Sequence, residues 1–174
     1  MCWNRPITRA LQYRDRYTFL KLYVKFVRCH LEFASSVTLA PCRDIETLGK
    51  VQRREVNYMT VQKGVTYEDK LREWGILSLA NRRYRADLIQ VFKILKEIED
   101  VDSSTWFTLV GQEPQRLTRN TAYHGNLVAA RSKTDIWSNS FTNRVIYKWN
   151  KLPSEVKDSR NFSIFKSKLD ELLN

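Results

Sequence analysis

The chain has 174 residues, of which 43% are hydrophobic, 28% charged and 12% aromatic, and its formal net charge is +11. These values are typical of one globular domain or a compact pair of helical lobes, and 5 Trp, 8 Tyr and 8 Phe exclude a disordered tail. Residues 1–20 lack the apolar run of a secretory signal, and no stretch is long enough to span a membrane. We therefore expect a soluble intracellular protein, nuclear or cytoplasmic and not secreted.

The first predicted helix covers residues 18–33. Its apolar residues recur at i, i+3, i+4 and i+7, and Lys21, Lys25 and Arg28 fall on the opposite side. The predicted apolar face consists of Leu20, Tyr23, Val24 and Val27. Residues 35–44 are predicted to form a loop because they contain Pro41.

A second helix is predicted to begin after Asp44, which is a suitable N-cap residue. Its interior positions are Ile45, Leu48, Val56 and Met59. A third helix is predicted between Thr66, an N-cap with Asp69 three residues later, and Gly75, a C-terminal glycine.

Ser78 is then expected to cap the helix with the strongest helical pattern of the chain. Its predicted apolar stripe consists of Leu88, Val91, Phe92, Leu95 and Ile98. Residues 100–125 are the least regular part of the chain. Short strands are an alternative prediction for residues 106–110 and 127–130.

The stretch 143–156, NRVIYKWNKLPSEV, predicts a helix followed by a corner. The apolar side of one amphipathic helix is predicted to consist of Ile136, Trp137, Phe141, Val145, Ile146 and Trp149. Within it, Val145, Ile146 and Trp149 form a core-facing stripe. Asn150 tolerates a left-handed helix end, and Pro153 suits the first turn of a short following helix. A last helix, capped by Ser159 or Asn161, carries an apolar face made of Phe162, Phe165, Leu169 and Leu172.

These elements predict an all-α fold, an irregular multi-helix bundle with two helical lobes joined by a long loop. We assign residues 1–100 to an N-terminal helical lobe, 101–130 to an irregular connecting segment and 131–174 to a C-terminal helical segment.

No pattern in the chain indicates a catalytic site. There is no adjacent Asp pair to share two metal ions, no phosphate-binding glycine loop and no nucleophile elbow. His30 and His124 are the only histidines, and the three cysteines, Cys2, Cys29 and Cys42, lack zinc-ligand spacing and indicate reduced thiols. We predict no catalytic residue, no metal site and no cofactor.

Basic residues do form a pattern. The ends of the chain, residues 1–30 and 131–174, carry net charges of +6 and +4, whereas residues 31–130 carry +1. Such a distribution favours a polyanionic partner, although a basic surface also serves solubility. Within it, two clusters on predicted helices are candidate phosphate contacts: Lys50, Arg53 and Arg54, and Arg82, Arg83 and Arg85. The alternative is that these side chains cover the core or pair with Glu46, Glu55 and Asp87.

Four blocks in order carry a family resemblance: YVKFVRCHLEFASSV, DIETLGKVQRREV, TYEDKLREWGILSLANRRYRADLIQVFKILK, and FTNRVIYKWNKLPSEV with SIFKSKLDELL. They resemble the region that follows the reverse-transcriptase domain in jockey-like non-LTR retrotransposons (LINEs), over residues 20–172. Cys29, Thr38, Gly49 and Ala86 depart from the family pattern of Pro, Trp, Glu and Gly, as in a decayed copy.

The resemblance implies a thumb-proximal, C-terminal portion of an RNA-directed DNA polymerase, whose catalytic aspartates and endonuclease domain lie outside it. The expected activity is non-catalytic, nonspecific binding of RNA or DNA. Alternatives are a structural module that self-associates or binds a reverse-transcriptase palm domain in trans, and a decayed element with no selected function.

Overall fold

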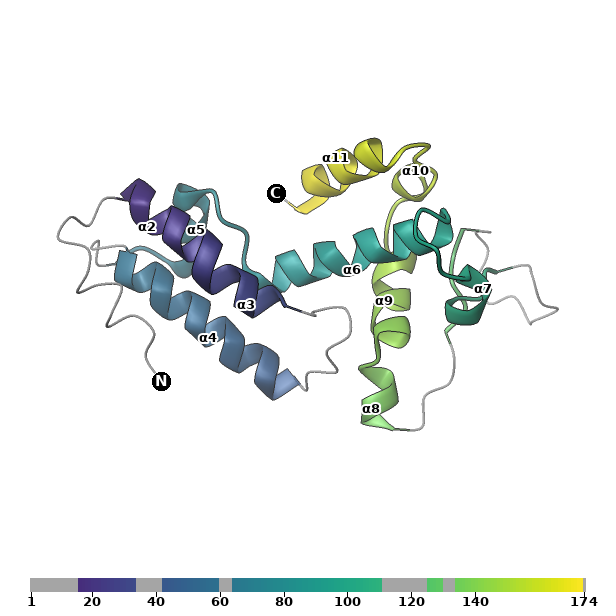
Figure 1. Ribbon diagram of the computed structural model, residues 1–174, viewed down its shortest axis with the longest axis horizontal. Coiled ribbons are helices and arrows are strands. Elements are labelled where there is room, and N and C mark those ends of the chain that lie inside the picture. The colour runs from purple at the N-terminus through teal and green to yellow at the C-terminus, as the bar shows by residue number, and fades with distance from the viewer. Residues whose placement is uncertain (1–15, 34–41, 60–63, 111–124, 130–133, 174) are drawn as a thin grey trace. The chain divides into compact units, whose positions relative to one another are not determined.

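The computed structural model describes residues 16–33, 42–59, 64–110, 125–129 and 134–173 (Figure 1). Helices make up the regular structure of these ranges, which confirms the predicted all-α class. None of the helices in these ranges is long and apolar enough to cross a membrane. The chain divides into two compact units, residues 1–33 with 47–79 and residues 34–46 with 80–174.

This division differs from the predicted one, which groups residues 80–100 with the N-terminal lobe. The long helix α6, Leu79–Leu95, explains the difference, because its apolar face packs in the core of the second unit. The assignment of these regions to parts of a polymerase stays a prediction.

The first described element of the first unit is one continuous helix in three segments: α2, Arg16–Leu22; η1, Tyr23–Arg28; and α3, Cys29–Glu32. The middle segment is π-helical, with i→i+5 hydrogen bonds, so each turn holds more than 3.6 residues. Tyr23 and Leu31 are buried, whereas Val24 is exposed. The prediction of Val24 as a core residue was wrong because it assumed an α-helical period.

Helix α4, Cys42–Met59, begins before the predicted N-cap. Asp44 lies in its first turn, so its assignment as the cap was wrong. The buried side of α4 is more polar than predicted, because Gln52 and Glu55 are buried with Val56, whereas Ile45 is exposed.

Helix α5, Tyr67–Trp74, has the predicted ends. At its start the Asp69 amide donates to Thr66 Oγ1 at 3.3 Å, and Thr66 Oγ1 donates to Asp69 Oδ2 at 2.7 Å. At its end Gly75 is left-handed with φ +62°, and the amides of Gly75 and Ile76 donate to the carbonyls of Arg72 and Leu71. This is the Schellman arrangement that a C-terminal glycine favours.

Gln52 ties the elements of the first unit together. Its Oε1 accepts from the Leu79 amide at 2.7 Å and from the Tyr67 hydroxyl at 3.0 Å, and its Nε2 donates to the Leu77 carbonyl at 3.1 Å. One buried amide therefore joins α4 to α5 and to the segment that leads into α6.

In the part of the chain that the structure describes, the second unit contains α6 and these further helices: α7, Ser103–Trp106; α8, Asp135–Ser138; α9, Phe141–Asn150; α10, Ser154–Lys157; and α11, Phe162–Leu173. The prediction of one helix from Ile136 to Trp149 was wrong at its start, because α8 and α9 are separate helices and Trp137 is exposed. Helices α6, α9, α10 and α11 gather around one core (Figure 1). The core includes Leu88, Val91, Phe92, Val145, Trp149, Phe165 and Leu169. Ile98 and Leu172 were predicted to join it but are exposed, because α6 ends at Leu95 and Leu173 packs against the core instead.

The strands left open by the sequence reduce to one antiparallel β-bridge between Leu109 and Leu127. Asn150, at the end of α9, extends this bridge: its Nδ2 donates to the Leu127 carbonyl and its Oδ1 accepts from the Leu127 amide, both at 2.9 Å. The expectation that Asn150 forms a left-handed helix end was wrong, since the only non-glycine residue of positive φ in the described ranges is Glu97.

A short helix follows the corner after α9, as predicted, but Pro153 is its N-cap and not a residue of its first turn. Lys157, the last residue of α10, is buried there. Its Nζ donates to Asn126 Oδ1 at 2.7 Å and to the Asn150 carbonyl at 3.1 Å. Burial lowers the pKa of Lys157, and the charge of neighbouring Asp158 opposes that change.

Candidate nucleic-acid interface

The first candidate cluster, Lys50, Arg53 and Arg54, lies on the exposed side of α4. The spacing i, i+3 and i+4 places all three on one helical face. The opposite side buries Gln52 and Val56, so the solvent-facing direction of the cluster is set by the core of the first unit.

Packing against α5 holds one member of this cluster in place. The Arg53 guanidinium lies 4.9 Å from the centroid of the Tyr67 ring, within the range of a cation–π contact. The Tyr67 hydroxyl in turn donates to Gln52. Burial raises the pKa of Tyr67, while the positive charge of Arg53 acts in the opposite direction.

The acids that the sequence offers as partners do not neutralise the α4 cluster. Among the described residues no ion pair joins Lys50, Arg53 or Arg54 to Glu46, Glu55 or Asp87. Three positive charges therefore face solvent on two adjacent turns of α4, an arrangement of the type that can contact phosphate groups.

The second candidate cluster, Arg82, Arg83 and Arg85, lies in the first turns of α6, and all three side chains are half-buried. Arg85 binds Asp170 of α11 through two parallel bonds, Nη2 to Oδ2 at 2.9 Å and Nε to Oδ1 at 2.5 Å. This bidentate pair occupies the guanidinium that a phosphate would need. The two clusters belong to different units, so the three residues within each cluster lie together but the clusters are described separately.

Sequence reasoning missed a buried ion-pair centre in the second unit. The Asp87 carboxylate is buried and binds Arg144 Nη2 and Lys148 Nζ of α9, each at 3.0 Å. The spacing of Arg144 and Lys148, i and i+4, was the available signal, but their shared partner lies 57 and 61 residues away from them in the chain.

The described residues contain no group of three or more His, Cys, Asp and Glu side chains that could hold a metal ion. Cys29 is an exposed thiol whose Sγ donates to the Lys25 carbonyl at 2.8 Å. Cys2, His124 and the side chain of Cys42 lie outside the described residues.

Comparison with known proteins gives no family assignment: no family model, no curated protein and no solved structure matches the chain. The resemblance to the region after a retrotransposon reverse-transcriptase domain stays a prediction from the sequence blocks.

Proposed function

We propose that this chain is a non-catalytic portion of a retrotransposon RNA-directed DNA polymerase that binds RNA or DNA without sequence specificity. The four ordered sequence blocks support the ancestry. The observation that supports the activity is the α4 cluster, three exposed basic side chains on one face of a helix.

Charge alone is weaker support than this geometry. A net charge of +11 is compatible with many surfaces, but basic residues held in fixed register match the spaced charges of a phosphate backbone. The helix that carries the α4 cluster is held in place, because Gln52 bonds to Tyr67 of α5 and to Leu79, and Arg53 lies against the Tyr67 ring. We assign phosphate contacts first to Lys50, Arg53 and Arg54.

Arg82, Arg83 and Arg85 are the secondary part of the proposal. Arg85 contacts phosphate only when the nucleic acid replaces Asp170, so its contribution is expected to be smaller. Arg82 and Arg83 are half-buried and have partners within the protein.

The test is a charge-reversal variant, Lys50→Glu with Arg53→Glu and Arg54→Glu. Affinity for a labelled duplex or single strand is expected to fall by about tenfold or more, since phosphate contacts supply nearly all nonspecific affinity. The matched control reverses Lys96, Arg160 and Lys166, which changes the net charge equally at sites outside α4. Equal losses in the two variants contradict the assignment of a site on α4.

A second candidate function is self-association, and exposed aromatic side chains favour it. Tyr17 and Phe26 on the first helix are 64% and 58% exposed, and Phe33, which follows its last residue, is 81% exposed. Apolar surface of this kind is a common protein-binding feature, and a palm domain in trans is the alternative occupant.

Size-exclusion chromatography with light scattering separates these two functions. A monomer that changes mass only when nucleic acid is added supports the binding proposal, whereas a dimer that persists at high salt supports self-association. Primer extension with Mg²⁺ tests the non-catalytic part of the proposal: we expect no product, and any templated product contradicts it.

A further inference from the structure

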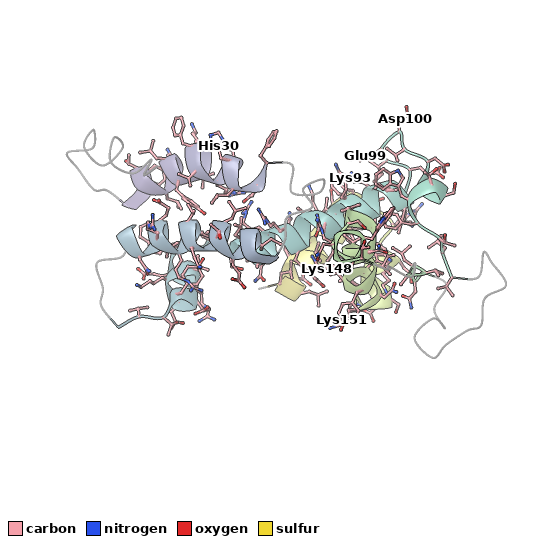
Figure 2. All side chains as sticks on the ribbon, turned by 90° about the horizontal axis from the view of Figure 1, so that it is seen from below. His30, Lys93, Glu99, Asp100, Lys148 and Lys151 are labelled. Atoms are coloured by element: carbon pink, nitrogen blue, oxygen red, sulfur yellow. The ribbon has the colours of Figure 1, made fainter. Side chains whose placement is uncertain are left out.

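Helix α9 carries a second basic surface, distinct from the α4 cluster and built around an exposed tyrosine. Arg144, Tyr147, Lys148 and Lys151 follow one another at i, i+3, i+4 and i+7 and share one side of the helix. We call these four residues the α9 rim. Lys148 lies in the last turn of α9 and Lys151 directly follows its last residue, Asn150; both are labelled in Figure 2.

The charges on the α9 rim differ in their pairing. Arg144 and Lys148 share the Asp87 carboxylate. Lys151 is exposed, and within the described residues no acid pairs with it. Local positive charge therefore remains at the solvent-facing end of the rim.

Tyr147 is the unusual member of the rim. It is 67% exposed, although its neighbours Val145, Ile146 and Trp149 on the same helix are buried. Lys151 Nζ lies 4.3 Å from the centroid of the Tyr147 ring, so the ring and an unpaired cation form one unit. A second lysine–tyrosine contact lies beside it, with Lys148 Nζ 5.3 Å from the centroid of the half-buried Tyr84 ring.

Exposed aromatic rings interleaved with cations are the surface that proteins use for single-stranded nucleic acid. The rings stack on unpaired bases and the cations bind the phosphates between them. A duplex cannot use Tyr147 in this way, because its bases are already stacked and paired. An anionic membrane or an acidic peptide would use the charges but has no base to place on the ring.

We propose that the α9 rim is a binding site for unpaired nucleotides, with a base stacked on Tyr147 and the adjacent phosphate bound by Lys151. The site rests on the proposed nucleic-acid-binding function and adds to it a preference for single strands. Arg144 and Lys148, held by Asp87, line the path of the backbone next to the stacked base.

The test compares two labelled oligomers of about 12 nucleotides, one with bases and one abasic, by fluorescence anisotropy. Both have the same phosphate charge, so only stacking separates them. Tyr147→Ala is expected to weaken binding of the base-bearing oligomer by about fivefold or more and to leave the abasic oligomer within about twofold. Tyr147→Phe, which keeps the ring, is expected to retain wild-type affinity for both.

Two matched controls show whether position matters. Trp137→Ala removes another exposed aromatic ring, 65% exposed in α8, and is expected to change neither affinity. Lys166→Gln removes a lysine that also lies over a ring, 4.2 Å from the centroid of Phe162 in α11, and is expected to change neither affinity. Lys151→Gln, by contrast, is expected to weaken the binding of both oligomers.

The outcomes separate this site from the α4 cluster. If Tyr147→Ala leaves the base-bearing oligomer unchanged, or weakens both oligomers equally, the stacking site is wrong. The charge reversal on α4 is measured in parallel: a loss there with no effect of Tyr147→Ala leaves the proposed function standing without this site. A Tyr147 effect with no α4 effect leaves the α9 rim as the binding surface, and a wild-type protein that binds neither oligomer contradicts both proposals.

Discussion

Removing the Trp149 side chain is the most informative perturbation of the second unit. The ring is 3% exposed and belongs to the core of α6, α9, α10 and α11. Its Nε1 donates to the Gly125 carbonyl at 3.0 Å, and its ring centroid lies 6.1 Å from that of Phe165. Trp149→Ala therefore deletes core packing and one hydrogen bond together.

The expected cost follows from these contacts. Truncating a buried Trp or Phe to Ala typically costs about 3–5 kcal/mol, and a lost hydrogen bond to a backbone carbonyl adds about 1 kcal/mol. Trp149 should lie in the upper part of that range. Since a domain of this kind has a total stability of about 5–15 kcal/mol, a large part of the second unit's stability depends on one ring.

Urea denaturation followed by circular dichroism measures this cost. Trp149→Phe is expected to recover most of the loss, because it restores apolar volume without the hydrogen bond to Gly125. Trp137→Ala is the matched control: its ring is 65% exposed, and the change in unfolding free energy should stay within about 0.5 kcal/mol. A cost below about 1 kcal/mol for Trp149→Ala would refute the assignment of this ring to the core.

Three further substitutions test the local structure. Asn150→Ala is expected to cost about 1–3 kcal/mol, because it leaves the amide and carbonyl of Leu127 without their partner, and amide hydrogen exchange at Leu127 should accelerate. Thr66→Ala removes the N-cap of α5 and should cost about 1 kcal/mol in the same denaturation assay, whereas Thr66→Ser should be nearly neutral. The hydrogen bond from Arg85 holds the pKa of Asp170 below its ordinary value. The pair therefore stabilises the folded chain at pH values above the unfolded pKa of about 4. This stabilisation is lost as the pH falls through the lower pKa of the folded state. Asp170→Asn should flatten the dependence of the urea midpoint on pH below about 4, and an unchanged profile would show that the pair adds nothing to stability.

Helix ends and core positions that depend only on residues close together in the chain could be predicted from the sequence. The Thr66 cap and the Gly75 end of α5 follow from residue type and spacing, and the core positions of Val145, Ile146 and Trp149 follow from helical period. In these places the local pattern and the folded structure agree.

Elsewhere the chain departs from a regular period. The π-helical segment Tyr23–Arg28 changes the winding of the first helix, and Val24, assigned to the apolar face at 3.6 residues per turn, is exposed. Helix α6 ends at Leu95 because Glu97 adopts a left-handed conformation with φ +52°, which residue propensity does not predict for Glu.

In the candidate sites too, contacts between residues far apart in the chain could not be predicted from the sequence. The exposure of Lys50, Arg53 and Arg54 follows from their common helical face, but the burial of Gln52 depends on Leu79, 27 residues away. A side chain that bonds to a distant backbone group has no local signature. The pairing of Arg85 with Asp170, 85 residues later, is of the same kind and changes what that arginine is free to bind.

The central claim is that the exposed α4 cluster binds nucleic-acid phosphates, and the salt dependence of affinity tests it most directly. Each phosphate contact contributes about 0.7–0.9 to the slope of log affinity against log salt concentration. Replacing Lys50, Arg53 and Arg54 together by Gln should therefore reduce the magnitude of the wild-type slope by about two to three, on both RNA and DNA. An unchanged slope and affinity in this variant would contradict the account.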